Sequence, residues 1–309
     1  MLRLTAIVPA TNSPPTLESC LAAIGATDAQ PDQLVVVRAA SGAGPAAARN
    51  TGAAQATGDI LVFVDADICV HRDVFVRVRE AFAKDDELAA LFGSYDDAPA
   101  AEGVVSVFRN LLHHHVHQTS GGPATTFWGG VGAVRADVFR GSGGFDAERF
   151  SVPCVEDIEL GMRIAAGGGR IVLDPRIQGT HLKAWTLRQM IHTDLWRRGV
   201  PWTRLLLEQG TSAGGLNLRW QHRLSTAAVV VGASALVLRR PAVSGASLLT
   251  LALLNRSFYG LLLRRRGPVE AVMGVGLHAI HHLTAAAAVP IALAGHHLDR
   301  RRARVTTCA

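Results

Sequence analysis

The sequence has few cysteines, and none of them belongs to a recognisable cysteine site. Four are scattered over the 309 residues, Cys20, Cys69, Cys154 and Cys308, with no C-x-x-C pair among them. Structural zinc sites use closely spaced thiolates, and the disulfide frameworks of secreted proteins use paired ones. The sequence therefore predicts a reducing compartment and no structural zinc.

A secretory signal and a dinucleotide-binding turn are also missing. The N-terminal stretch Met1–Pro9 is too short and too strand-like for a signal peptide, so we expect the N-terminal domain to remain in the cytoplasm. Gly42 and Gly44 do not complete a G-x-G-x-x-G pattern. The classical dinucleotide fingerprint is therefore excluded.

Charge and apolar content point to a membrane more than to nucleic acid. The formal net charge is +6, and 49% of the residues are hydrophobic. Nucleic-acid-binding proteins and membrane proteins both show such a balance. Here the arginines concentrate beside apolar segments, at residues 239–240, 264–266 and 300–304. Nucleic-acid binding is therefore the less favoured explanation.

Strands and helices alternate at the start of the chain. Residues 4–8, 34–37 and 60–64 have the apolar, β-branched composition of strands. Residues 17–24 and 46–56 have helical spacing, and Ser13 precedes two prolines in the manner of an N-cap for the first of these helices. This alternation predicts a parallel sheet with right-handed crossovers.

Two carboxylates, Asp65 and Asp67, follow the strand at residues 60–64 directly. In an extended chain they would point the same way, roughly 7 Å apart. Open α/β sheets bind ligands beyond the carboxyl ends of their strands, and paired acids there suit a divalent cation that carries a diphosphate. The alternative is a strand that simply ends in a polar turn.

The middle of the chain offers two further candidate features. A helix is expected at residues 74–82 and a strand at 88–92, followed by four histidines within residues 113–117. These histidines could bind a metal or belong to a helix that lines a cleft, and the lack of neighbouring carboxylates favours the helix. Trp128 precedes a Gly-rich segment that allows close backbone approach to a ligand. Its ring could stack on a sugar or pack in the core.

Acidic residues open a helix in the second half of the chain. Glu156 and Asp157 begin a helix that runs to about residue 166, where the helix dipole is by itself a sufficient reason for acids. A short strand is expected at residues 170–173. His181 follows, either as a structural hydrogen-bonding group or as a ligand.

The C-terminal third has the composition of a membrane-associated region. Residues 186–207 resemble a basic amphipathic helix pair with Trp and Arg, as at a membrane interface. Residues 271–298 contain no Asp, Glu, Lys or Arg and are long enough to span a bilayer, which takes ~20 residues. Residues 224–238 and 242–254 are uncharged but short, and could form a hairpin. Three spans, or two spans with an interfacial helix, both remain open, and a buried helical bundle is the alternative.

Several of these pieces together resemble the family 2 glycosyltransferases over about residues 4–185. The matching stretches appear in the family's order: residues 5–12, residues 48–52 and 57–59, the Asp65-Ala66-Asp67 triplet, residues 143–146 and residues 156–163. The resemblance implies a GT-A nucleotide-diphospho-sugar transferase fold, Rossmann-like with a mostly parallel sheet, followed by C-terminal membrane helices. It also implies inverting transfer from a nucleoside-diphosphate sugar, with Mg²⁺ or Mn²⁺ as cofactor.

The resemblance assigns roles to particular residues. Asp157 matches the catalytic base, with Glu156 beside it. The other implied positions are Pro9, Ala10, Asn12, Arg49, Asp65 and Gly130 for the donor, Trp128 and Trp185 for the acceptor, and Asp67, Asp65 and His181 for the metal.

Two departures from the family pattern bear on the substrates. Residues 37–41 lack the acidic pair that relatives usually carry for reading the nucleotide base, which leaves the base open. The Q-x-x-R-W motif of processive synthases is not present as such, since Arg197 and Arg198 precede Gly199-Val200-Pro201-Trp202. This favours transfer of a single sugar over polymer synthesis.

The expected organisation is a catalytic domain and a membrane region. Residues 1–215 would form the GT-A domain, with a donor half at about 1–95, an acceptor half at 96–190 and interfacial helices at 186–215. Residues 216–309 would be membrane-embedded. The expected partners are a nucleotide-sugar donor, a lipid-like or otherwise amphiphilic acceptor and the cytoplasmic (inner) membrane, with the catalytic domain facing the cytoplasm. The alternative is a catalytically degenerate membrane protein that binds nucleotide sugar or a partner without turnover.

Overall fold

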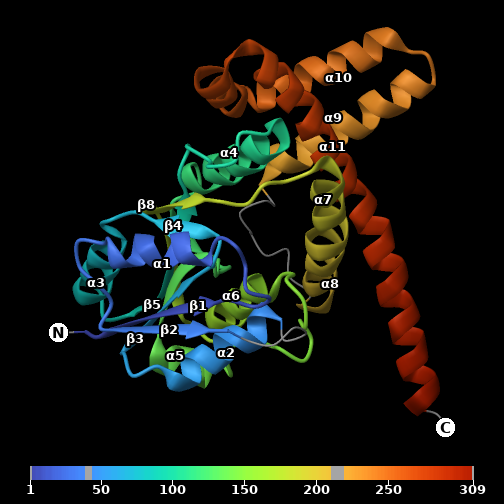
Figure 1. The fold of residues 1–309 in the computed structure, drawn as a ribbon. Helices are drawn as coiled ribbons and strands as arrows, with labels where there is room; N and C mark the ends of the chain where they lie inside the picture. The colour runs from blue at the N-terminus through green and yellow to red at the C-terminus, as the bar shows by residue number, and fades with distance from the viewer. Residues whose placement is uncertain (1, 39–43, 210–218, 308–309) are drawn as a thin grey trace. The chain divides into compact units, whose positions relative to one another are not determined.

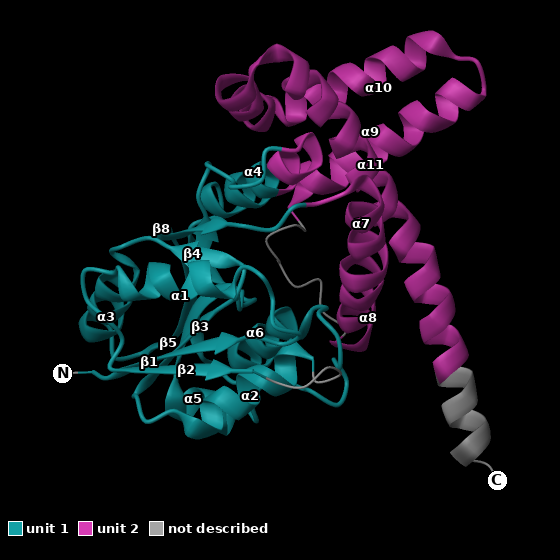
Figure 2. Cartoon of the chain, in the orientation of Figure 1, with its two compact units in different colours: residues 1–102, 110–184 teal, residues 103–109, 185–309 magenta. Residues whose placement is uncertain are grey.

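The computed structural model describes residues 2–38, 44–209 and 219–307. The chain divides into two compact units, residues 1–102 with 110–184 and residues 103–109 with 185–309 (Figure 2). Residues 39–41 of the segment that lacks the acidic pair and the predicted domain boundary at 215/216 lie outside the described residues, as do the side chains of residues 300–304.

The first unit is built on one mixed sheet with helices on it (Figure 1). Its strands run in the order β2-β1-β3-β7-β5-β8-β4, and β6 pairs with β8 outside this path. The strands are β1 Leu4–Pro9, β2 Gln33–Val37, β3 Ile60–Val64, β4 Ile68–Val70, β5 Leu88–Tyr95, β6 Gly122–Ala124, β7 Val131–Arg135 and β8 Arg170–His181.

The first three strands form the parallel part of the sheet. β1 pairs in parallel with β2 and with β3, and helices α1 (Leu17–Gly25) and α2 (Pro45–Gln55) supply the crossovers. All five residues of β3 are buried, as expected for a strand covered on both faces. The alternation in the sequence therefore predicted this half correctly.

The rest of the sheet is mixed in direction. β7 runs antiparallel between β3 and β5, while β5 and β8 pair in parallel. The strand expected at residues 170–173 continues to His181, because β8 pairs first with β5 and then with β4. The sequence patterns did not indicate β4, β6 or β7. The helices of this part are α3 Val74–Lys84, α4 Val104–Gln118, α5 Ala136–Gly141 and α6 Glu156–Ala166.

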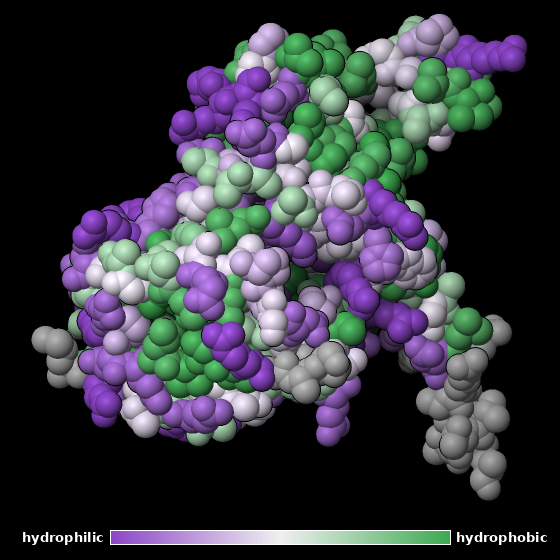
Figure 3. Space-filling model, in the orientation of Figure 1, coloured by the Kyte–Doolittle hydropathy of each residue, from purple (hydrophilic) through white to green (hydrophobic). Residues whose placement is uncertain are grey.

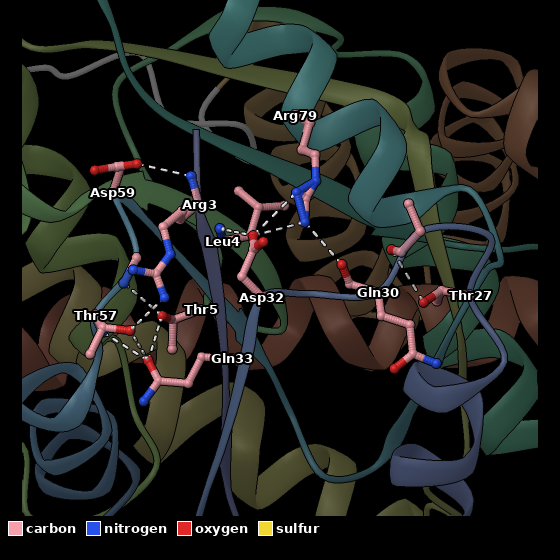
Figure 4. A network of polar contacts seen from close by, with 12 residues as sticks. Arg3, Leu4, Thr5, Thr27, Gln30, Asp32, Gln33, Thr57, Asp59 and Arg79 are labelled. Atoms are coloured by element: carbon pink, nitrogen blue, oxygen red, sulfur yellow. Dashed lines mark hydrogen bonds and ion pairs between the residues drawn. The ribbon is translucent and has the colours of Figure 1, made fainter. Parts of the chain in front are cut away.

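A polar network holds the amino ends of the first strands together (Figure 4). The Arg3 N–H donates to Asp59 and the Leu4 N–H donates to Asp32, both at 2.8 Å. Arg79 also donates to Asp32, at 2.9 Å. These contacts fix the amino end of β1 against its neighbours. Ligand sites of open α/β sheets lie at the opposite edge, beyond the carboxyl ends of the strands.

The predicted N-cap at Ser13 was wrong. Helix α1 begins at Leu17, and Thr16 precedes it without a side-chain capping bond. Asn12 and Ser13 have φ angles of 62° and 45°, which places them in the left-handed region. Because a cap residue needs extended backbone, Ser13 instead belongs to the loop after β1.

The second unit is helical. Its helices are α7 Leu187–His192, a π-helical segment η1 Thr193–Gly199, α8 Val200–Gln209, α9 Trp220–Val237, α10 Pro241–Leu254 and α11 Arg256–Thr307. A kink at Gly267, with φ of 82°, interrupts α11 before Pro268. Among the described residues, the stretch Arg256–Asp299 is the one helix long and apolar enough to cross a membrane.

Candidate functional site

The carboxyl end of β3 turns sharply at the acidic triplet. The Asp65 N–H donates to the Gly130 carbonyl at 2.9 Å, and the Ile68 N–H donates back to the Asp65 carbonyl at 3.0 Å. The expected extended conformation of Asp65-Ala66-Asp67 was therefore wrong, because β3 ends at Val64 and β4 already begins at Ile68. The turn sends the two carboxylates to different partners.

Arg49 of α2 joins two acids, one after β3 and one at the start of α6. Its Nη2 donates to Asp65 Oδ1 at 2.6 Å, and its Nη1 donates to Glu156 Oε1 at 3.0 Å. The Arg49 side chain is 5% exposed, so both ion pairs lie away from bulk water. The guanidinium packs against backbone, since a Cβ at Gly129 would lie 3.2 Å from Arg49 Cζ.

Asp157 is held in a fixed position at the start of α6. Its Oδ2 accepts the Gly129 N–H at 3.0 Å, and its Oδ1 accepts the Ile158 N–H at 2.8 Å. The neighbouring Glu156 Oε2 accepts the Cys154 N–H at 2.8 Å. Gly161 allows α6 to approach, because a Cβ there would lie 2.2 Å from the Phe127 backbone nitrogen. The carboxylate therefore faces the Gly-rich segment beside β7.

The environment of Asp157 favours its protonated form. Burial raises the pKa of the Asp157 carboxyl to about 6, and the negative charge of Glu156 adds to this effect. Arg49 and the two backbone N–H groups oppose the rise. Burial also raises the pKa of Asp65, against the opposing charge of Arg49. A carboxyl that titrates near neutrality can accept and release a proton at physiological pH.

Asp67 lies beside His181, at the end of β8. His181 Nε2 is 3.6 Å from Asp67 Oδ2, and the His181 ring stacks on Tyr95 with centroids 4.3 Å apart. Burial opposes ionisation of Asp67, but its interaction with His181, together with the charge of Lys183, outweighs the effect of burial and lowers the pKa of Asp67. Asp67 is therefore an ionised carboxylate at neutral pH.

An aromatic cluster adjoins this pair. Tyr95 meets Trp128 edge-on at 4.9 Å, and the His113 ring lies 4.7 Å from that of Trp128. His114 and His117 each make an Nδ1 hydrogen bond to a backbone carbonyl of β5, at 2.8 and 2.9 Å. Two of the four histidines therefore hold α4 against the sheet, and Trp128 packs among these rings while remaining half-buried.

The other predicted donor positions lie at the same edge of the sheet. Pro9 ends β1, and the Ala10 N–H donates to the Val37 carbonyl at 2.9 Å. Asn12 follows as an exposed residue of the loop. Gly130 pairs with Asp65 through its carbonyl, and a Cβ there would collide with the Trp128 ring.

Trp185 belongs to the second unit rather than to this cluster. The Arg109 guanidinium lies over its ring, 4.9 Å from the centroid. Its backbone N–H donates to Ser106 Oγ at 2.8 Å. The structure therefore brings together the predicted residues of the first unit, whereas Trp185 lies in the second unit.

Three residues of the site were not identified from the sequence. Tyr95 supports His181, Gly129 supplies a backbone donor to Asp157, and the Cys20 thiol donates to the Asp65 carbonyl at 3.6 Å. Of these three, only Gly129 lies in a segment that the sequence indicated as a candidate, the Gly-rich segment after Trp128.

Asp67 and His181 fit a divalent cation bound jointly with a substrate. Mg²⁺ is commonly held by one or two protein ligands, with phosphate oxygens and water completing its shell. Asp65 Oδ1 is already engaged by Arg49, and the described residues contain no group of three or more His, Cys, Asp or Glu arranged around one metal position. The described residues therefore offer two ligands, and a bound molecule or water would have to supply the others.

Part of the chain matches the model of a known family, and its fold is similar to that of solved structures. Residues 25–140 match the model of the family described as Glycosyl transferase family 2. A mannosyltransferase from Pyrobaculum calidifontis, solved with GDP-Man and Mn²⁺, is 19% identical and superposes with a TM-score of 0.56, over 93% of this chain and 87% of that one. TarS 1–349 of S. aureus is 13% identical with a TM-score of 0.48, over 95% and 92% of the two chains.

No curated protein matches the sequence. The mannosyltransferase superposition confirms the predicted GT-A fold, and the family match covers β3 with its acidic turn. Residues 25–140 are therefore similar to the family 2 glycosyltransferases, and the chain has a GT-A fold.

Proposed function

We propose that the protein is an inverting glycosyltransferase that moves a single sugar from a nucleoside-diphosphate sugar to a lipid-like or otherwise amphiphilic acceptor at the cytoplasmic face of the membrane. The observation that carries the proposal is the pair of ion pairs that Arg49 makes with Asp65 and with Glu156, the residue next to Asp157 in the chain. It joins an acidic turn suited to a donor diphosphate with a buried carboxyl suited to proton transfer.

Asp157 is the general base in this proposal. An acceptor hydroxyl attacks the anomeric carbon as the diphosphate leaves from the opposite face, and Asp157 takes the hydroxyl proton. Its raised pKa makes the carboxylate a stronger base than an exposed Asp. The two backbone N–H donors fix its orientation, and Glu156 positions Arg49 beside it.

The donor lies over the carboxyl ends of β1 and β3. Pro9, Ala10 and Asn12 border the nucleotide, and Asp65 reaches the ribose or the metal. Arg49 is too buried to serve as a first donor contact, so its part is to hold Asp65 in place. Gly130 keeps the backbone close to the sugar, and Trp128 and Trp185 are assigned to the acceptor.

Asp67 and His181 would hold Mg²⁺ or Mn²⁺, with Asp65 as a further candidate ligand. When bound, the cation neutralises the charge that grows on the leaving diphosphate. Asp67 Oδ2 and His181 Nε2 lie 3.6 Å apart, so a carboxylate oxygen and a ring nitrogen are available side by side as ligands.

The test is metal-dependent turnover by the purified chain across a panel of nucleotide sugars. Asp157→Asn should lower turnover about 10²- to 10⁴-fold and leave donor binding intact. Asp67→Ala should abolish the dependence of donor binding on Mn²⁺. A fully active Asp157→Asn or Asp67→Ala would contradict the mechanism. Nucleotide-sugar binding without turnover in the unmodified protein would identify the degenerate, non-catalytic alternative.

A further inference from the structure

Helices α9 and α10 form a hairpin with its polar residues on the inside. Ser225 is fully buried, and Asn255 is 3% exposed. The Asn255 Nδ2 donates to Ser225 Oγ at 2.9 Å. Gly232 lets the helices approach closely, since a Cβ there would lie 2.9 Å from that of Ser247. Ser225, Ser247 and Asn255 are therefore buried in the hairpin together with the apolar Val229 and Leu251.

The outside of the same hairpin is apolar. Residues 224–238 and 242–254 carry no charged side chain. Val231, Leu249 and Leu253 are 50%, 60% and 61% exposed. Hydrophobic residues gather over the hairpin, and hydrophilic ones lie at its end (Figure 3). A soluble helix pair buries its large apolar residues, whereas helices in lipid pack through small and polar residues and face the lipid with large apolar ones.

Arginines lie at both ends of the hairpin. Arg239 and Arg240 form the turn between the helices, and Arg223 and Arg256 lie at the open end. Residues 224–238 rise ~22 Å as a helix, against a hydrocarbon core of ~30 Å. Arginine stems that extend toward the head groups, with local thinning of the bilayer, make up such a difference.

Helix α11 is long and apolar enough to span a bilayer, but its contacts differ from those of the hairpin. Its later half packs on η1 and α8 through polar contacts: His281 Nδ1 lies 2.8 Å from Asp194 Oδ2, and Arg204 lies 3.5 Å from Asp299. Asp194 also forms a buried ion pair with Arg109. If α11 crossed the bilayer, these charged partners would have to enter hydrocarbon with it, which is costly.

We propose that the α9–α10 hairpin crosses the bilayer, with Arg239 and Arg240 in the opposite head-group layer, and that α11 stays on the side of the catalytic unit. The inference rests on the proposed membrane association, and its partner is a lipid bilayer. It also agrees with the positive-inside tendency. Most arginines beside the apolar segments then lie on the catalytic side: Arg219, Arg223, Arg256, Arg264, Arg265 and Arg266.

The test is cysteine labelling of the full chain in intact cells and in inverted membrane vesicles. The native cysteines are replaced by alanine, and single cysteines are introduced as Leu249→Cys, Arg240→Cys, Leu298→Cys or Asp86→Cys. Leu249 and Leu298 form a matched pair, 60% and 57% exposed, and the Asp86 side chain is fully exposed in the catalytic unit. A membrane-impermeant maleimide is the probe.

The expected pattern separates the four positions. Leu249→Cys should resist labelling from both sides until detergent is added, and Arg240→Cys should label only from the side opposite to Asp86→Cys. Leu298→Cys should label from the same side as Asp86→Cys. Protection of Leu298→Cys, or labelling of Arg240→Cys from the side of Asp86→Cys, would overturn the proposal, and so would recovery of the protein in the soluble fraction.

A second measurement keeps the native cysteines. Leu249→Arg should lower the amount of membrane-retained protein at least 10-fold, and Leu298→Arg should leave it unchanged; equal effects would refute the inference. Neither assay needs a donor or an acceptor. An inactive protein with the expected labelling pattern would therefore count against the proposed function alone.

Discussion

Replacing Arg49 by methionine tests the link that this residue makes between Asp65 and Glu156. The variant removes a cation from between Asp65 and Glu156 and keeps an unbranched side chain of similar length. The Glu156 side chain is 6% exposed, whereas that of Asp65 is 31% exposed. Water can therefore reach Asp65 when the cation is lost, but Glu156 is left as a buried anion.

The expected loss is that of breaking a buried ion pair, about 3–5 kcal/mol. For a unit of this size each kcal/mol shifts Tm by about 2–4 °C, so Arg49→Met should lower Tm by roughly 6–20 °C. The assay is thermal unfolding of the purified full chain at pH 7.5.

Double variants identify which acid carries the loss. Arg49→Met with Glu156→Gln should recover most of the lost stability, because the amide oxygen can still accept the Cys154 N–H. Arg49→Met with Asp65→Asn should recover little. The reasoning would be refuted by an Arg49→Met variant within about 1 kcal/mol of the unmodified protein, or by equal recovery in the two double variants.

Two further predictions follow from the site. The pH profile of turnover should rise with pH to a plateau, with its midpoint near the Asp157 pKa of about 6, because the base must be ionised and its burial favours the protonated form; a flat profile between pH 5 and 8 would contradict the assignment. Gly161→Ala should destabilise the protein by about 1–3 kcal/mol or prevent folding, since its Cβ would lie 2.2 Å from the Phe127 nitrogen. Gly141→Ala, where nothing lies within 4 Å, is the control that should leave the unfolding midpoint unchanged.

Local patterns predicted the parallel half of the fold. The apolar residues of β3 and the helical spacing of α1 and α2 are short-range signals, and the structure confirms the alternation that they indicated. Strand β7 was not predicted, because Gly132 interrupts the run of apolar residues in its sequence. That glycine is required by packing, since a Cβ there would lie 2.3 Å from the Trp128 carbonyl. A segment that forms a strand because of packing against neighbouring strands need not contain residues with a high intrinsic strand propensity.

The site was predictable as a set of residues but not as an arrangement. The acidic triplet and the Glu156-Asp157 pair are visible as motifs, yet the turn at Asp65-Ala66-Asp67 depends on β4 pairing with β8. Likewise, the motif around Arg49 indicates a donor ligand. The burial of Arg49 and its bond to Glu156, 107 residues away, arise only from the tertiary fold, which places Arg49 of α2 beside the first residue of α6.

The two units differ in which side chains they bury and which they expose. This difference bears on whether each unit is surrounded by water or by lipid. In the first unit the large apolar residues such as Phe63, Phe75 and Phe92 are fully buried. In the α9–α10 hairpin Ser225 is fully buried and Leu251 is 2% exposed, whereas Val237 is 82% exposed. The sequence shows only that residues 224–238 and 242–254 are uncharged and largely apolar, which suits a soluble core as well as a membrane. The direction in which the folded helices point those side chains distinguishes the two, and here it favours a hairpin surrounded by lipid.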